Sequence, residues 1–175
     1  MDETAPALRP FLPADAARAI ALFRASVEGL TEDFYDEDQR AAWASAADDA
    51  AAFVKRIAEN LAIVALLDGA IAGFATLKNN AEFDMLYVHP DFARRGVGAA
   101  LAEAIEKLAG ARGTATLGVD ASDAARDFFA KRGYVAQRRN TVELNGEWLG
   151  NTTMTKALEK PAVDPRLGGA KGRPQ

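Results

Sequence analysis

Residues 86–101 read LYVHPDFARRGVGAAL, and this stretch decides the fold. An apolar strand leads into a loop that contains a proline, and a basic turn with two glycines then opens a helix. Glycine lets a ligand approach the backbone closely, and the first amides of a helix have no acceptor within the helix. Together with the positive end of the helix dipole and two arginines, these amides suit a pyrophosphate. The stretch therefore predicts a strand, a phosphate-binding turn and a helix.

The composition is that of one ordinary globular domain. The chain has 175 residues, of which 49% are hydrophobic and 26% charged. We expect one domain over residues 1–158 and a tail over 159–175, where proline and glycine are frequent and apolar residues are few. The net charge of −4 argues against a general nucleic-acid binder, so we expect no nucleic-acid partner.

Cysteine is absent, which excludes disulfides, thiol nucleophiles and thiolate metal sites. The one histidine, His89, has no second imidazole or thiol to complete a transition-metal site, so we assign no metal. The N-terminus is acidic and no apolar signal region follows it. The apolar run over 61–67 is far shorter than the ~20 residues that span a bilayer. We therefore expect a soluble, cytoplasmic protein without a membrane partner.

Apolar spacing predicts the element order β-α-α-β-β-β-α-β-α-β-β, an α/β fold of the α+β type with a mixed sheet. Two hairpin turns are the clearest local signals, at Asp68-Gly69 and Asn145-Gly146. The predicted strands cover about 7–12, 61–67, 70–77, 82–88, 114–119, 135–144 and 147–156. The predicted helices start near Asp15, cover about 38–59 with a break near 45–48, and cover about 96–109 and 123–132.

Three segments together resemble the GNAT superfamily of acyl-CoA-dependent N-acyltransferases. They are VHP at 88–90, RRGVGAAL at 94–101 and DASDAARDFFAKRGY at 120–134. The resemblance covers about 7–156, and its specific motifs lie between about 82 and 134. It implies a single GNAT-like domain whose mostly antiparallel sheet is splayed at a central parallel strand pair. It also implies acetyl-CoA, that is CoA carrying the acetyl group, as cosubstrate in the gap between those two strands.

The resemblance further implies a set of binding residues. The backbone at Leu86, Tyr87 and Val88 is expected to bind the pantetheine arm and to polarise the thioester carbonyl. Ser122 and Phe129 also match positions that border the cofactor, although the family often has Asn and Tyr there. That Tyr protonates the leaving thiolate in the family, whereas Phe129 has no proton to give, and Ala93 replaces a frequent Gln or Arg. The pyrophosphate is assigned to Arg94, Arg95, Gly96, Val97, Gly98 and Ala99.

Amine acetylation needs a route for protons, because an amine of lysine type has a pKa of ~10.4. Strand alternation is expected to place Glu82 and Asp84 on one face together with Leu86 and Val88. Either carboxylate is a candidate base through water, with Asp84 nearer the acetyl position. Both also suit the polar side of a half-exposed strand. With Phe129 inactive, the thiolate proton is expected from solvent or from one of the three tyrosines, Tyr134, Tyr87 and Tyr35.

Acidic residues follow the first helix, where the resemblance places the acceptor side. These acids are expected to attract a cationic amine, on a small molecule or a peptide. Asp36 to Asp38 equally suit the N-terminus of a helix. The acids concerned are Glu28, Glu32, Asp33, Asp36, Glu37 and Asp38.

The sequence thus predicts an N-acetyltransferase that moves an acetyl group from acetyl-CoA to a primary amine by direct attack in a ternary complex. The absence of cysteine favours direct attack over a cysteinyl acyl-enzyme. A non-catalytic acyl-CoA-binding sensor or scaffold is the alternative, motivated by Phe129. No Gly-x-x-x-x-Gly-Lys-Ser/Thr occurs, which excludes a P-loop. Monomer and homodimer both stay open, and the C-terminal hairpin offers an edge for pairing.

Overall fold

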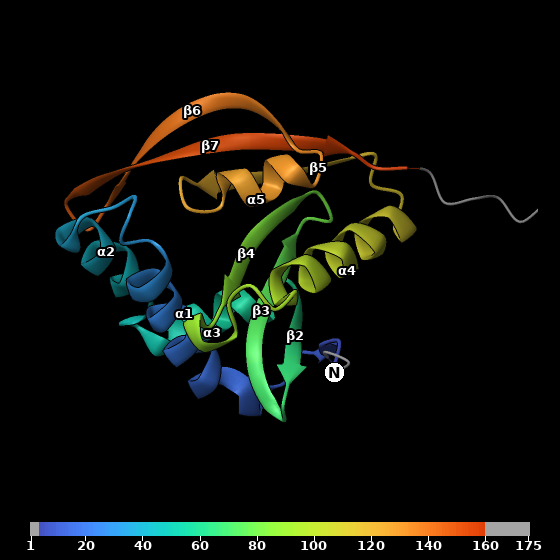
Figure 1. Ribbon diagram of the computed structural model, residues 1–175, viewed down its shortest axis with the longest axis horizontal. Coiled ribbons are helices and arrows are strands. Elements are labelled where there is room, and N and C mark those ends of the chain that lie inside the picture. Colours follow the sequence, from blue (N-terminus) through green and yellow to red (C-terminus); the bar gives the residue numbers. More distant parts are fainter. Residues whose placement is uncertain (1–3, 160–175) are drawn as a thin grey trace, which may run out of the picture.

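The computed structural model describes residues 4–159, which form one seven-stranded sheet with helices on both faces (Figure 1). The strand order is β1-β2-β3-β4-β5-β7-β6. Every neighbouring pair is antiparallel except β4 and β5, which confirms the predicted mixed sheet with its central parallel pair. The expected tail lies outside the described residues beyond Glu159. The strands are β1 (Ala7–Pro10), β2 (Leu61–Leu67), β3 (Ala70–Lys78), β4 (Glu82–Val88), β5 (Thr116–Ser122), β6 (Val135–Leu144) and β7 (Glu147–Ala157).

Two separate cores lie on the two faces of the sheet. One core packs α4 and α5 against β2 to β5, and the other packs α1 and α3 against β2, β3 and β4. None of the helices within residues 4–159 is long and apolar enough to cross a bilayer. The helices are α1 (Ala16–Leu30), α2 (Glu37–Ala44), α3 (Ala50–Ala58), α4 (Val97–Ala111) and α5 (Arg126–Lys131), with single 3-10 turns η1 (Pro13–Asp15), η2 (Ser45–Ala47) and η3 (Pro90–Phe92).

Local turn chemistry explains the elements that the sequence predicts best. Asp68-Gly69 and Asn145-Gly146 adopt positive φ at all four residues, as the two-residue turns between β2 and β3 and between β6 and β7 require. The predicted break near 45–48 is the turn η2, which separates α2 from α3.

Three predicted boundaries were wrong by two or three residues. β1 ends at Pro10 rather than near Leu12, because the chain turns into η1. β5 runs on to Ser122 instead of ending at 119, because β7 pairs with it as far as Ser122 opposite Asn151. α5 consequently starts at Arg126 and not near Asp123.

The parallel strands β4 and β5 separate soon after they meet. They pair only at Glu82 with Gly118 and at Phe83 with Val119. Beyond these positions β4 pairs with β3 alone and β5 with β7 alone, so the sheet opens between the two central strands. The expected splay at the parallel pair is confirmed, and the edge of β4 that faces the gap has no strand partner among residues 4–159 after Phe83.

A β-bulge in β4 corrects the expected alternation of side chains. Thr76 of β3 pairs with Met85 and Leu77 pairs with Phe83, so Asp84 is the extra residue. Leu86 packs against the core on the α4 side, whereas Asp84 reaches Arg56 of α3 on the opposite face. The prediction that Glu82, Asp84, Leu86 and Val88 share one face was therefore wrong, because the bulge shifts the period-two pattern by one residue.

Candidate active site

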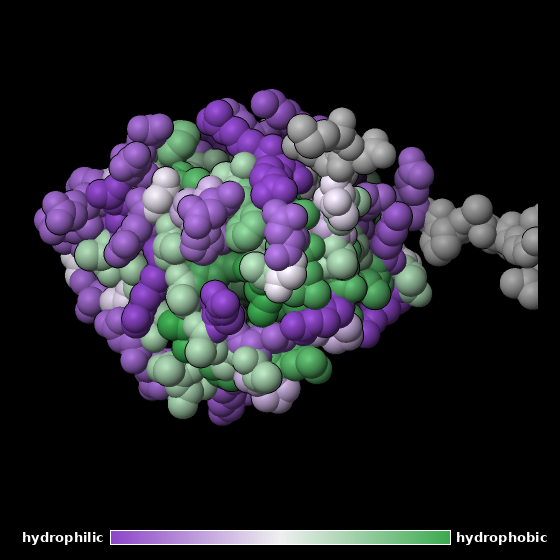
Figure 2. Space-filling model, turned by 60° about the horizontal axis from the view of Figure 1, so that its bottom comes forward, coloured by the Kyte–Doolittle hydropathy of each residue, from purple (hydrophilic) through white to green (hydrophobic). Residues whose placement is uncertain are grey.

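A cleft of about 560 Å³ opens where β4 and β5 separate. Its walls come from β4, from the end of β5, from α5, from α1 with the segment that follows it, and from the β6–β7 hairpin. Figure 2 shows hydrophobic residues gathered across the middle of one face of the molecule, with hydrophilic residues around them. Of the predicted site residues, the cleft is lined by Glu82, Asp84, Leu86, Tyr87, Val88, Gly98, Ser122 and Phe129.

The turn before α4 has the backbone of an anion site. Arg94 and Gly96 have φ of 62° and 80°, and the amide of Ala100 donates to the Gly96 carbonyl at 3.0 Å. The amides of residues 97–99 precede that bond and have no acceptor within the helix. Arg94 is exposed and has no ion-pair partner among the described residues. Arg95 instead bonds Asp68 at 3.2 Å, so Arg94 is the guanidinium available to an anion.

Gly98 lies where the cleft meets the first turn of α4. A Cβ built on it would stand 3.5 Å from the Phe128 ring and 3.7 Å from the Val88 side chain, which are ordinary contact distances. Packing within the protein therefore does not require glycine here, whereas a ligand lying against the backbone would. Val97 differs, because its side chain is buried in the core and only its amide can serve a ligand. These residues fit the diphosphate and pantetheine arm of CoA.

Tyr87 lies at the centre of the cleft's aromatic residues. Its hydroxyl accepts a hydrogen bond from Trp43 Nε1 at 3.3 Å, and its ring meets the Phe23 ring edge-on with centroids 4.8 Å apart. Burial raises the pKa of Tyr87 to about 12. The hydroxyl therefore keeps its proton at neutral pH.

The Asp84 carboxylate is held by an arginine. Arg56 of α3 donates from Nε to Oδ2 at 2.7 Å and from Nη2 to Oδ1 at 2.9 Å, and Asn60 Nδ2 lies 3.4 Å from Oδ2. The pKa of Arg56 is raised, mainly by this hydrogen bond to Asp84. Both oxygens of Asp84 are therefore engaged. Glu82 is more exposed and lies 3.9 Å from Lys78.

Tyr134 lies behind the cleft, outside its lining. Its hydroxyl donates to Glu106 at 3.0 Å, and the pKa of Tyr134 is raised by burial and by the charge of that carboxylate. Phe129 separates Tyr134 from the cleft, with ring centroids 5.1 Å apart. The structure therefore brings Phe129 to the cleft together with Tyr35 and Tyr87, but not Tyr134.

The six acids expected on the acceptor side do not line the cleft. All six are exposed, and Glu28 lies in the last turn of α1 rather than after the helix; the cleft is lined in this region by Leu30, Thr31 and Tyr35. The Asp36 side chain accepts the Gln39 amide at 2.8 Å and so caps α2, with Glu37 and Asp38 in its first turn. The helix-start role of residues 36–38 is thereby confirmed.

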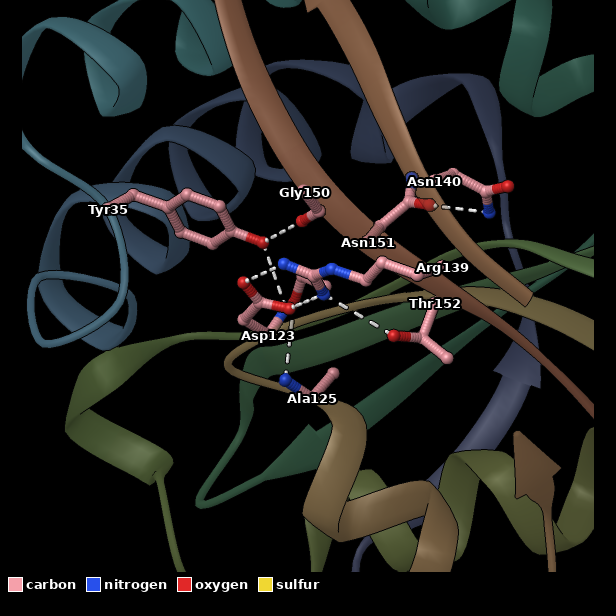
Figure 3. A network of polar contacts seen from close by, with 9 residues as sticks. Tyr35, Asp123, Ala125, Arg139, Asn140, Gly150, Asn151 and Thr152 are labelled. Carbon is pink, nitrogen blue, oxygen red and sulfur yellow. Dashed lines mark hydrogen bonds and ion pairs between the residues drawn. The ribbon is translucent and has the colours of Figure 1, made fainter. Parts of the chain in front are cut away.

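A polar network that the sequence did not reveal joins three distant segments (Figure 3). The Tyr35 hydroxyl accepts from the Asp123 amide at 2.8 Å and donates to the Gly150 carbonyl at 2.6 Å. Both terminal nitrogens of Arg139 on β6 donate hydrogen bonds to the Asp123 carboxylate, and the guanidinium lies against Gly150. Burial raises the pKa of Tyr35. Only long-range packing assembles this network, so no local signal could have predicted it.

Asp120 is a further residue of the cleft that the sequence did not reveal. It lines the cleft from β5, and its Oδ1 accepts from the Thr153 hydroxyl at 2.6 Å. Asp120 has no cationic partner among the described residues. The signal was present, because Asp120 and Ser122 lie two apart and share a strand face, but the predicted strand ended at 119.

Comparisons with known proteins agree with this geometry. The profile of the acetyltransferase (GNAT) domain family matches residues 30–158. The uncharacterised N-acetyltransferase YafP of Escherichia coli K12 is 30% identical over 147 residues, which are 84% of this chain and 93% of YafP. A crystal structure from Rhodopseudomonas palustris, described as "GCN5-Related N-acetyltransferase: Aminotransferase, Class-II", is 60% identical with a TM-score of 0.88, covering 90% of this chain and 99% of that one.

A more distant structure shares the fold. The PaiA N-acetyltransferase of Thermoplasma acidophilum, solved with coenzyme A, is 18% identical with a TM-score of 0.71, covering 88% of this chain and 99% of that one. From the matching family profile and the relatives that share its length, we conclude that the chain belongs to the GNAT acetyltransferase family and is an acetyl-CoA-dependent acetyltransferase.

Proposed function

We propose that this enzyme transfers the acetyl group of acetyl-CoA to a primary amine by direct attack in a ternary complex. The observation that carries the proposal is the cleft between β4 and β5, which runs from the first turn of α4 to the aromatic residues of α1 to α3. One end suits a diphosphate and the other leaves room for a second substrate. The 175 residues contain no cysteine that could carry an acyl group.

Acetyl-CoA supplies the acetyl group: a C–N bond forms to the amine, the C–S bond breaks, and the proton lost by nitrogen is balanced by the proton gained by sulfur. The chain's own residues bind and orient. The amides of residues 97–99 and Arg94 hold the diphosphate, and the unpartnered edge of β4 at Leu86 to Val88 offers backbone N–H groups to the pantetheine arm and the thioester oxygen.

The proton route needs groups inside the cleft. Tyr35 and Tyr87 line it and stay neutral at pH 7, because burial raises the pKa of both. We assign the thiolate proton to Tyr87 or to water, since Phe129 has none and Tyr134 faces Glu106. Asp84 and Glu82 were predicted as bases. The Arg56 bond leaves Asp84 a positioning role, in which it anchors the bulge of β4 to α3.

The test begins with binding of acetyl-CoA by isothermal titration calorimetry. Arg94→Ala is expected to weaken binding about tenfold, equivalent to roughly 1.4 kcal/mol for a lost charge-assisted contact. Arg18→Ala, an exposed arginine on α1, is the matched control and should leave the affinity unchanged. Release of CoA thiol on addition of amines then measures turnover. Absence of acetyl-CoA binding by the unaltered protein would contradict the proposal.

A non-catalytic acyl-CoA sensor, the alternative motivated by Phe129, is not favoured by relatives named as N-acetyltransferases. The turnover assay separates the two possibilities. A sensor would bind acetyl-CoA and release no CoA thiol with any amine.

A further inference from the structure

The cleft has two halves on opposite sides of β4. One half lies towards α4 and α5 and includes Leu86, Val88, Gly98 and Phe128. The other half, here called the acceptor half, lies towards α1 and α3 and includes Tyr87. Because the free helix amides are on the α4 side, the proposed function leaves the acceptor half for the amine. The inference below rests on that assignment.

Five aromatic rings form a continuous wall in the acceptor half. Phe23 meets Phe53 at 4.9 Å and Tyr87 at 4.8 Å between centroids. Trp43 meets Tyr87 at 6.2 Å and Tyr35 at 5.6 Å, in both cases edge-on. All five residues line the cleft. Phe23, Phe53 and Tyr35 are buried and support the wall from behind, whereas Trp43 and Tyr87 are half-buried and offer their rings to an apolar guest or a cation.

The charges that border this wall are mostly neutralised. Asp84 is bound by Arg56, and Glu82 lies 3.9 Å from Lys78. The exposed acids that follow α1 stand outside the lining. Asp120 is the one carboxylate of the lining without a cationic partner among residues 4–159.

The position of Asp120 suits an ammonium group. Leu117, Val119 and Ala121 of β5 face the core on the α4 side, so Asp120 faces the acceptor side. The hydroxyl of Thr153, opposite it on β7, donates to Oδ1 at 2.6 Å, and Asn140 donates to that hydroxyl at 2.8 Å. One oxygen is thus fixed, while Oδ2 has no donor among the described residues.

We propose that the acceptor is an amine with a single positive charge on an aromatic or bulky apolar body, whose ammonium group pairs with Asp120 while the body packs on the aromatic wall. The bound ammonium releases one proton to water before its nitrogen attacks the thioester, so the overall reaction also releases one proton to solvent. The one carboxylate of the lining without a cationic partner among the described residues, Asp120, can pair with one ammonium group. A polyamine or an aminoglycoside would bring several charges against an apolar wall, where each would lose hydration without a partner. The enzyme would therefore discriminate against multiply charged amines by leaving their extra charges without partners, as well as favour the apolar amine through its contacts.

The experiment compares initial rates of CoA thiol release at saturating acetyl-CoA. The amines are 2-phenylethylamine, ethylamine, spermidine and kanamycin. We expect kcat/KM for 2-phenylethylamine to exceed each of the others by at least about tenfold, as removal of a buried aromatic contact implies. Faster turnover of spermidine or kanamycin would overturn the inference, and so would acetyl-CoA binding without acetylation of 2-phenylethylamine.

Variants test the two contacts separately. Asp120→Asn should raise KM for 2-phenylethylamine about tenfold and leave acetyl-CoA affinity within twofold, while Asp120→Glu retains part of the activity. Asp127→Asn, an exposed carboxylate of α5 outside the cleft, is the matched control. An unchanged KM in Asp120→Asn would refute the ammonium contact.

The wall is tested at Trp43. Trp43→Ala should reduce kcat/KM for 2-phenylethylamine about tenfold and for ethylamine less than threefold. Trp148→Ala is the control, because Trp148 is 59% exposed and outside the lining. If Trp43→Ala folds poorly, Trp43→Leu retains apolar volume and allows the same comparison of kcat/KM between the two amines. An equal loss for both amines would contradict a wall that recognises the body. If the unaltered enzyme did not bind acetyl-CoA at all, that result would instead refute the proposed function.

Discussion

Replacing Asp84 by asparagine separates a structural ion pair from a catalytic base. The Arg56–Asp84 pair is bidentate, at 2.7 and 2.9 Å, but the Arg56 side chain is 51% exposed and the Asp84 side chain 13%. Solvent around the guanidinium limits the pair to about 1–2 kcal/mol of the free energy of unfolding. At about 2–4 °C per kcal/mol for a chain of this size, Asp84→Asn should lower Tm by roughly 2–8 °C.

The kinetic expectation is equally specific. A positioning role predicts that kcat of Asp84→Asn falls by no more than about threefold once the protein is folded, whereas a general base contributes about 10²–10⁴-fold. The assay is CoA thiol release, with acetyl-CoA affinity measured by calorimetry. Asp48→Asn removes one side of the exposed Arg24–Asp48 pair and should change stability by less than about 0.5 kcal/mol. A hundredfold loss of kcat in Asp84→Asn with intact acetyl-CoA binding would refute the positioning role and restore Asp84 as the base.

Three other substitutions probe separate parts of the molecule. Gly98→Ala should weaken acetyl-CoA binding at least about tenfold, because its methyl group enters the cleft, while leaving Tm unchanged or higher. Gly110→Ala, in the same helix with open space around it, should leave the acetyl-CoA affinity unchanged. Equal affinities of Gly98→Ala and the unaltered protein in a titration would contradict the placement of acetyl-CoA against Gly98. Tyr87 has a folded pKa of about 12 against about 10 when unfolded, so its contribution of up to about 3 kcal/mol is complete below pH 10 and is lost as the pH rises to 12. The free energy of unfolding of Tyr87→Phe, measured by urea titration, should therefore decline less steeply than that of the unaltered protein between these pH values. Parallel declines would disprove the burial effect. The Glu106 side chain is 12% exposed and binds Arg132 at 3.0 Å, Tyr134 at 3.0 Å and Lys156 at 3.4 Å. Glu106→Ala should therefore lower the free energy of unfolding by about 3 kcal/mol without altering acetyl-CoA affinity. A loss below about 1 kcal/mol in a urea titration would show that the cluster is not stabilising.

Elements that depend on neighbouring residues were predictable from sequence. The turns at Asp68-Gly69 and Asn145-Gly146 and the helix that opens after Gly96 follow from positive φ and helix-start chemistry. The opening between β4 and β5 followed from the family resemblance.

Features that depend on strand register or on partners far along the chain were not predictable. The bulge at Asp84 arises from its register with β3, and the extension of β5 to Ser122 arises from pairing with Asn151. Both decide where carboxylates face. The bulge sends Asp84 to Arg56, and the longer strand places Asp120 in the cleft. The bond from Tyr35 to Gly150 likewise spans 115 positions, and no periodic pattern contains such information.

Gly150 limits which positions of the β6–β7 hairpin can be varied to change the specificity of this enzyme. A Cβ at this position would come within 2.8 Å of the Arg139 guanidinium carbon, so any side chain must move the end of the Arg139 side chain and disturb its bonds to Asp123. The bond from Tyr35 to the carbonyl of residue 150 is a backbone contact and does not depend on the side chain there. Saturation libraries should therefore sample its neighbours Leu149 and Asn151, which face the cleft, and keep glycine between them.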